Sequence, residues 1–421
     1  MSDSAPAAYR YYRAWPLLVF SVLCYFLTST VASSMNIAAG ILETERGWSS
    51  VVITSCISIA SVANVVFGFI AGRACVKHSA KSLCIVWCVL YLAGVACMGF
   101  SKLFAIFAVS MVVANAASSA LGYNTVPVLL ASWFPTKKGA VQGFVSMGIP
   151  LGAGFASMVY SWGYANLGVD AAFVPFMIVA AVAMVLLAAG IKDTPEESGF
   201  EPDTMERCEP HKPELVATEG EAAAADTSRD LLRNPRFLAL SAVLGIQLVY
   251  SGGLMVQIAP RLYEIGYSTD EAILAMLVSA LFACLGSFIC GVIGDKFGSR
   301  VGTIVCFVLG IAAVLLNLLG NPVCVFASLA LIGVVTGGAD NWPVNICAEY
   351  FGRGGFTGAF GLMLPIIQLV GAVGPSLFAI LADVAGSYFI SYVCAAALMA
   401  IGLVLFLVLT KNGLLGEEKQ S

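Results

Sequence analysis

Twelve long apolar runs separated by shorter polar stretches cover most of this chain. About 20 apolar residues allow a helix to cross a bilayer. The runs are continuous rather than alternating, so they predict helices and not membrane-spanning strands. We therefore expect an all-α membrane protein with twelve transmembrane helices. The runs lie at residues 16–40, 49–71, 82–101, 103–132, 139–163, 171–191, 236–260, 271–293, 301–320, 322–348, 355–382 and 388–410.

One polar stretch, residues 192–235, is much longer than the others and divides six runs from six. It carries prolines at 195, 202, 210 and 213, an alanine run at 222–225 and an excess of acidic residues, without apolar periodicity. This composition predicts a flexible or loosely helical tether. We expect a first six-helix bundle at 1–191, the linker at 192–235 and a second six-helix bundle at 236–421.

The two halves repeat one pattern of glycine, proline and polar residues. Duplicated halves are typical of secondary transporters, in which the solute site lies between the repeats. The copies differ in charge at one position, where Asn124 in the first half corresponds to Asp340 in the second. The other matched pairs are Gly122 and Gly338, Pro127 and Pro343, Gly139 and Gly354, Gly143 and Gly358, and Pro150 and Pro365.

The composition excludes several classes of protein. Of the 421 residues, 59% are apolar and 11% are charged, a balance that the surface of a soluble domain does not tolerate. The sequence has no phosphate-binding loop, dinucleotide fingerprint, metal-ligand spacing or nucleophile–base set. We therefore expect a monomer in the lipid bilayer that is not an enzyme and has no cofactor, metal or nucleic-acid partner.

Basic residues mark one side of the predicted membrane domain. With the N-terminus inside, 18 Lys and Arg residues fall in inner segments, against three in outer loops. Those three are Arg46, Lys102 and Arg261. The positive-inside rule then predicts that both termini are cytoplasmic, and we expect the plasma membrane of the cell.

Two inner loops carry a spaced motif of glycines and charges. The loop between runs eight and nine fits the frame G-x3-D-[RK]-x-G-x-[RK], with Asp295 as its acid, whereas the loop between runs two and three has Val76 at that place. A carboxylate beside a helix N-terminus can hold one side of a transporter closed. We expect such a latch in the second half only. The motif residues are Gly72, Arg73, Lys77, Gly291, Asp295, Lys296, Gly298 and Arg300.

The loop at 291–300 resembles the inner-loop signature of the major facilitator superfamily. Residues 133–139, 351–355, 371–375 and 383–388, with Thr194-Pro-Glu-Glu, are similar to its oxalate/formate antiporter and monocarboxylate porter branch. The resemblance implies a central cavity lined by helices 1, 4, 7 and 10. It also implies transport of a small carboxylate, with a proton or in exchange. That branch generally holds its anion with a cation in helix 8, sometimes helped by one in helix 11, and both helices lack Lys and Arg in this chain.

Asp340 is the only charged residue well inside any of the twelve runs. A carboxylate there costs several kcal/mol unless it is paired, hydrated or protonated, which favours a functional role. Pro127 and Pro343 free backbone carbonyls and permit kinks, and we expect kinks at Pro150 and Pro365 too. The polar residues expected along the solute or proton path are Tyr25, Asn36, Tyr123, Asn124, Gln247, Tyr250, Gln257, Arg261, Asp340 and Asn341.

Three functions remain open from the sequence. The first is a secondary transporter of a small carboxylate, by proton symport or exchange, with Arg261 attracting the anion. The second is a proton-coupled transporter of a neutral or cationic aromatic metabolite, with Asp340 as counter-ion. The third, a membrane sensor that does not transport, would need a signalling domain that the sequence does not show. For single Gln and Asn residues, hydrogen bonding between helices is an equally good interpretation.

Overall fold

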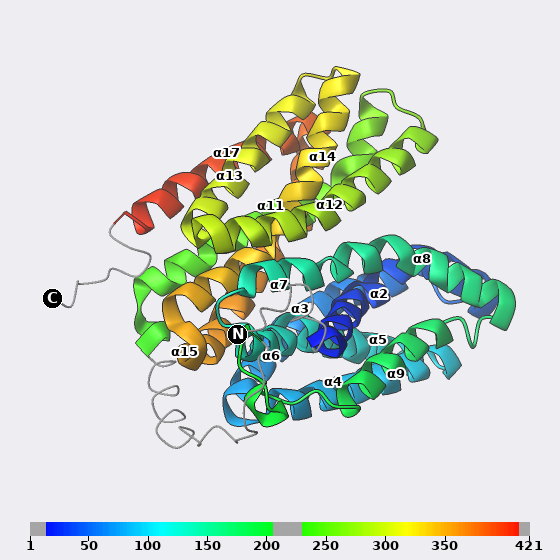
Figure 1. Ribbon diagram of the computed structural model, residues 1–421. Helices are drawn as coiled ribbons and strands as arrows, with labels where there is room; N and C mark the ends of the chain where they lie inside the picture. Colours follow the sequence, from blue (N-terminus) through cyan, green and yellow to red (C-terminus); the bar gives the residue numbers. More distant parts are fainter. Residues whose placement is uncertain (1–13, 205–229, 412–421) are drawn as a thin grey trace, which may run out of the picture.

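The computed structural model describes residues 14–204 and 230–411, and these form helices joined by short loops (Figure 1). Predictions about residues 205–229, the middle of the linker, lie outside this range. The first bundle contains α2 (Trp15–Arg46), α3 (Ser50–Lys77), α4 (Ala80–Phe100), α5 (Phe104–Ser119), the π-helix η2 (Ala120–Thr125), α6 (Val126–Trp133), α7 (Lys138–Ser146), α8 (Gly148–Leu167) and α9 (Val174–Ala188).

The second bundle begins after the linker, in which Glu196–Ser198 form one 3-10 turn, η3. Within this bundle α11 packs against α15, α16 and α17, and α12 packs against α14. Its helices are α11 (Pro235–Glu264), α12 (Thr269–Phe297), α13 (Ser299–Leu318), α14 (Pro322–Ala339), α15 (Asn341–Gly371), α16 (Gly374–Ala385) and α17 (Tyr388–Leu409).

Twelve membrane crossings can be traced through the described residues. Ten helical stretches are long and apolar enough to cross a membrane, and α9 is a shorter apolar helix. One of the ten, Pro322–Ala385, has 64 residues, which would be about 96 Å of straight helix, too long for one crossing. Gly352, with φ 58° and ψ −166°, interrupts α15 and divides this stretch into two crossings. The predicted all-α fold with two six-helix bundles is confirmed.

Several crossings are interrupted close to a proline. Pro127 follows the π-helix η2, while Pro150 and Pro343 are the third residues of α8 and α15. Proline is tolerated in the first turn of a helix because the amide it lacks would have no partner there. These prolines therefore begin the second segment of a broken crossing. Pro365 differs, since α15 continues through it.

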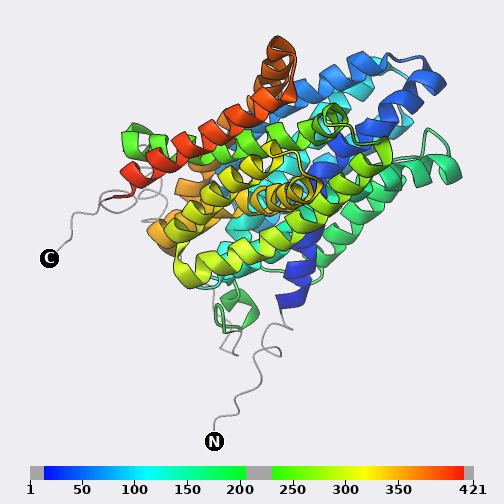
Figure 2. The same ribbon diagram turned by 90° about the horizontal axis from the view of Figure 1, so that it is seen from above.

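The bundles meet mainly through two helix pairs, α7 with α12 and α3 with α15. Both contacts lie at the end of the molecule that carries Lys77 and Lys296, which we call the basic end. Figure 1 shows the bundles close together near α6, α7 and α15, and farther apart where α8 ends and α12 begins. In the view from above, α2 begins and α17 ends toward the basic end (Figure 2).

The first part of the linker is not the loose tether that its composition predicts. The Asp193 carboxylate accepts hydrogen bonds from the Ser79 hydroxyl (2.5 Å) and the Lys81 amide (2.8 Å) at the start of α4. The Asp203 carboxylate accepts from the backbone amides of Thr136 and Lys137. Acidic side chains that satisfy free amides fold residues 193–203 back against the first bundle.

Candidate functional site

A cavity of about 130 Å³ lies between the two bundles, with Tyr25, Tyr123, Asp340 and Gln368 among its lining residues. The rest of its wall is apolar and includes Phe360. The cavity draws on α2, η2, α11, α14 and α15, and so on both halves of the repeat. This is the arrangement that the duplicated sequence predicts.

Asp340 occupies the break between α14 and α15, three residues before Pro343. Its side chain is half-buried in the cavity wall. Within the described chain it forms no hydrogen bond and no ion pair. Because no Lys, Arg or His among the described residues lines this cavity, Asp340 is the only ionisable acid or base that they bring to it apart from the tyrosines.

Two tyrosines form the opposite wall of the cavity. Tyr25 is fully buried, and its hydroxyl accepts a 2.5 Å hydrogen bond from Gln142 Nε2 of α7. Tyr123 meets the Tyr25 ring edge to face, with centroids 6.1 Å apart. The two rings offer an aromatic surface with hydroxyl groups that can accept or donate.

Two amide side chains meet beside the cavity at Gly68 of α3. A Cβ atom at Gly68 would lie 3.2 Å from Gln368 Oε1 and 3.7 Å from Asn124 Oδ1. Both oxygens are buried and have no hydrogen-bond partner within the described chain. Asn124 was expected here from the repeat, but Gln368 was missed. Its signal was a lone amide in an apolar stretch, three residues after Pro365.

The polar stripe of α11 does not face the central cavity, which corrects the prediction for Tyr250. Its hydroxyl is buried and donates to the Gly310 carbonyl of α13 (3.1 Å). Gln247 and Gln257 are also buried, and both amide groups lack a partner in the described chain. The cavity instead receives the neighbouring apolar face of α11, through Leu244 and Leu248. Helical periodicity identified the polar face of α11 but not the helix against which this face packs.

Arg261 is a structural residue of the second bundle rather than a free cation. It is 4% exposed, donates from Nε to Asn317 Oδ1 (3.2 Å) and pairs with Glu264 (2.8 Å). Its guanidinium also lies 5.7 Å from the ring centroids of Phe389 and Tyr392. Arg261 is thus paired and packed within the second bundle and does not line the central cavity, so its predicted role in attracting an anion stays a prediction.

Two further predicted path residues lie outside the cavity lining. Asn36 is exposed on α2. Asn341 is fully buried, accepts from the Ser146 hydroxyl (3.0 Å) and donates to the Ser287 carbonyl (2.7 Å). Since Ser146 belongs to the first bundle, Asn341 holds the bundles together instead of lining the cavity.

Asp295 forms the expected latch at the basic end. Its carboxylate accepts from the backbone amides of Gly139 (2.8 Å) and Ala140 (2.7 Å) at the start of α7. A Cβ atom at Gly139 would lie 2.5 Å from both Asp295 Oδ1 and the Gly291 carbonyl oxygen. The helix N-terminus stabilises the anion, and the paired glycines allow the close approach. This contact crosses from one bundle to the other.

The other residues of the two loops do not cross between the bundles by hydrogen bonds within the described chain. Arg300 donates from Nε to the Thr410 hydroxyl (3.2 Å), within the second bundle. Gly298 takes φ 84° between α12 and α13, a backbone angle that favours glycine. Lys296, Arg73 and Lys77 are exposed.

An acid from the linker adds a second charged contact to the second bundle. Glu196 forms a bidentate ion pair with Arg353 of α15, at 2.7 and 3.1 Å. Burial disfavours the charged form of Glu196, but the Arg353 hydrogen bonds and charge outweigh it, so its pKa lies below the usual range. The pair therefore persists at neutral pH and is lost only as the pH falls through that lowered pKa. Sequence reasoning missed this residue.

We expect Glu196→Arg or Arg353→Glu to lower the ratio of closed to open basic end by about 2- to 5-fold, because exposed ion pairs contribute little. The double charge swap should recover most of the loss. Spin-label distances between α4 and α13 would measure the ratio. Glu201→Arg is the control, because Glu201 is an exposed acid of the same segment that forms no ion pair within the described chain. If the double variant opened the basic end as much as the effects of the two single variants added together, the pairing would be contradicted.

Comparison with known proteins agrees with this geometry. The sequence pattern of the Major Facilitator Superfamily matches residues 21–262 and 252–420. The chain belongs to this superfamily. Together with its long apolar helices, this identifies an integral membrane protein.

Two curated superfamily relatives match parts of the chain. The uncharacterized MFS-type transporter YhjX of Escherichia coli is 24% identical over 247 residues, 58% of this chain and 57% of that protein. The gentisate transporter of Corynebacterium glutamicum is 32% identical over 158 residues, 36% of each chain. The matched segments thus cover 57% and 36% of the length of these two relatives.

Solved superfamily structures share the fold over nearly the whole chain. The proton:xylose symporter XylE aligns with a TM-score of 0.72 and 15% identity, covering 96% of this chain and 98% of XylE. The human organic anion transporter MFSD10 aligns with a TM-score of 0.69 and 12% identity, covering 96% of this chain and all of that chain. At such identities the likeness concerns the fold.

Proposed function

We propose that this protein is a proton-coupled secondary transporter that works by alternating access. The observation that carries the proposal is Asp340, an unpaired carboxyl group in the cavity between the two halves. An ionisable group at membrane depth marks an ion or proton pathway in most transporters. The bundles would rock around this cavity, and the basic end, with both termini, would face the cytoplasm at the plasma membrane.

In this proposal the described conformation is closed on the cytoplasmic side. The Asp295 latch and the Glu196–Arg353 pair join the bundles there. Opening that side would break both contacts and expose Asp340 to the cytoplasm, while the other side closes. A proton that binds Asp340 from one side could then leave on the other, which couples the solute to the proton gradient.

The lining favours a solute with an apolar body and a group that donates hydrogen bonds or carries a positive charge. Asp340 and the unpartnered oxygen of Gln368 are acceptors in the lining, and the unpartnered oxygen of Asn124 lies beside it. The faces of Tyr25 and Tyr123 suit a cation or an aromatic ring. No Lys, Arg or His of the described chain lines the cavity to hold an anion.

A second candidate solute is an aromatic carboxylate. The match to the gentisate transporter supports it, as does the resemblance to monocarboxylate porters. Without a cation, such a solute would share a proton with Asp340, since a protonated carboxyl group can donate to a carboxylate. Uptake would then be proton symport by necessity.

Counterflow into proteoliposomes would test these proposals. The probes are 2-phenylethylamine, 3-phenylpropanamide and 3-phenylpropanoate, which share a ring and differ in the polar group, together with gentisate. We expect at least ~tenfold preference for the amine or amide over 3-phenylpropanoate, equivalent to ~1.4 kcal/mol. Counterflow of gentisate and 3-phenylpropanoate alone would select the second candidate. Exchange of no probe above the level of empty liposomes would contradict both.

A further inference from the structure

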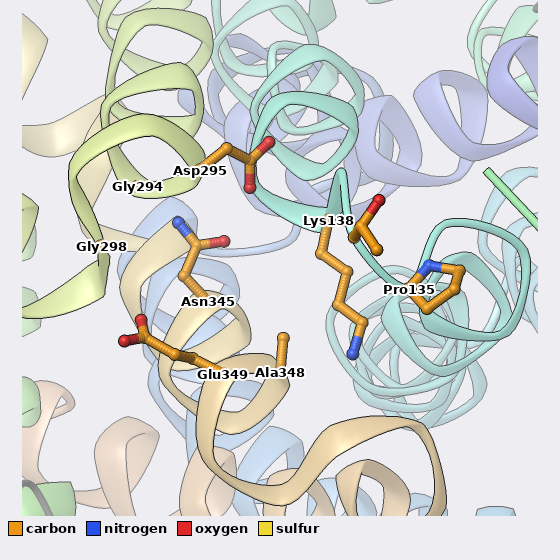
Figure 3. A pocket seen from close by; sticks show the side chains of 9 residues that line it. Pro135, Lys138, Gly294, Asp295, Gly298, Asn345, Ala348 and Glu349 are labelled. Carbon is orange, nitrogen blue, oxygen red and sulfur yellow. The ribbon is translucent and has the colours of Figure 1, made fainter. Parts of the chain in front are cut away.

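A second cavity, of about 310 Å³, lies between the bundles at the basic end, apart from the cavity of Asp340. Its walls come from the start of α7 in the first bundle and from α12 and α15 in the second. Figure 3 shows Lys138 and Asn345 on facing sides of it, with Asp295 and Glu349 at its edges. Because both bundles supply the wall, separation of the bundles would dismantle the cavity.

Lys138 brings a buried ammonium group to this cavity. The residue is 6% exposed, and within the described chain Nζ has no carboxylate within ion-pair distance. Nζ lies 5.3 Å from the centroid of the Phe356 ring. A ring face only partly replaces the hydration that a buried ammonium loses.

Asn345 adds an amide group without partners. It is also 6% exposed, and within the described chain neither Oδ1 nor Nδ2 has a hydrogen-bond partner. Buried amides are nearly always hydrogen-bonded in folded proteins. Lys138 therefore offers unused donors to this space. Figure 3 shows Asn345 Oδ1 on the side of Lys138, whereas Nδ2 lies toward Gly294 of α12, and a half-turn of the amide would present Nδ2 to the cavity instead.

The two carboxylates at the edges of the cavity are already engaged. Asp295 accepts from the amides of Gly139 and Ala140, and Glu349 accepts from the Ser299 amide (2.9 Å) at the start of α13. Each helix N-terminus offsets part of the negative charge that it binds. Within the described chain Lys138 has no such hydrogen bond. Asp203, an acid whose charge acts on Lys138, already accepts from the amides of Thr136 and Lys137, so an anion in the cavity would be the first direct partner of this ammonium group.

We propose that this cavity binds a small oxyanion, through a carboxylate or phosphate group, and that the bound anion stabilises the closed basic end. Lys138 supplies the charge and Asn345 a hydrogen bond. The anion can contact both bundles only while α7 lies against α12 and α15. An anion on that side would therefore slow transport without competing for the central cavity. The site is independent of which solute the protein carries.

The test uses full-length protein in phosphatidylcholine nanodiscs, titrated with sodium phosphate or sodium acetate against sodium chloride at equal ionic strength. We expect saturating phosphate or acetate to raise the unfolding midpoint by about 2–4 °C and to increase the closed fraction in spin-label distances. Lys138→Met should raise the half-saturating concentration of phosphate or acetate at least ~tenfold. Lys138→Arg should retain binding. Lys137→Met, whose side chain does not line the cavity, is the control.

Several outcomes decide the proposal. Equal shifts in wild type and Lys138→Met, or a larger open fraction with phosphate, would overturn it. A shift that appears only after phosphatidylglycerol is added, and that Lys138→Met removes, would support the site with a lipid phosphate as its ligand. Loss of the effect in Lys137→Met as well as Lys138→Met would mean general charge rather than this cavity, and would also overturn it.

Discussion

We expect Asp340→Asn to abolish solute uptake driven by a proton gradient while solute exchange continues. The amide keeps the shape of the side chain but cannot bind and release a proton. The coupling free energy carried by such a site corresponds to about 5- to 150-fold, so net uptake should fall by at least ~tenfold. Proteoliposomes with an imposed pH gradient, compared with the same vesicles in counterflow, would measure both activities.

Asp383→Asn is the matched control for this prediction. Asp383 is an exposed acid on α16 of the same bundle and does not line the central cavity. It should leave the coupling unchanged, and Asp340→Glu should retain part of it. Full gradient-driven uptake by Asp340→Asn would show that the proton is carried elsewhere. Loss of both uptake and exchange would show that solute binding itself needs the carboxylate of Asp340 and not only a hydrogen-bond acceptor there.

We expect Gly72→Ala to prevent closure of the basic end and so to stop transport. A Cβ atom at Gly72 would overlap the carbonyl oxygen of Gly361 and lie 2.7 Å from its Cα. Backbone cannot rotate away as a side chain can, and overpacking of this kind costs about 1–3 kcal/mol. The ratio of closed to open basic end should fall by roughly 5- to 150-fold. Spin-label distances between α3 and α15 would measure it.

Gly68→Ala, one turn earlier on the same helix, is the comparison. Its Cβ would meet the Gln368 side chain at 3.2 Å, which can move, so closure should persist while affinity for the solute changes. Gly154→Ala should change neither, because no atom of the described residues lies within 4 Å of the added Cβ. A Gly72→Ala protein that transports at the wild-type rate would show that close contact between α3 and α15 is not needed for the cycle.

Local sequence predicted the latch in the second half but not the contact that replaces it in the first. The spacing around Asp295 is local, and a helix N-terminus attracts a carboxylate wherever the two meet. Glu196 was hidden in a stretch whose composition is typical of a tether. Its partner Arg353 is 157 residues away, and only folding places them side by side.

The sequence also identified polar faces without showing what they contact. Tyr250 and Arg261 lie on one stripe of α11, but the stripe turns inward to α13 and α17. An apolar face of the same helix lines the central cavity. In a helix that is largely apolar all round, hydrophobic periodicity does not distinguish a face toward a cavity from a face toward another helix.

By itself, the sequence determined the twelve crossings, the duplicated halves and the place of Asp340, because hydrophobic length, proline and an intramembrane charge act within a short segment. Only the tertiary structure decided that Gln368 shares the cavity, that Arg261 is already paired, and that Lys138 faces a cavity without a carboxylate partner in the described chain. These properties depend on which helices meet at which depth. That is set by the packing of both bundles, and a single segment does not encode it.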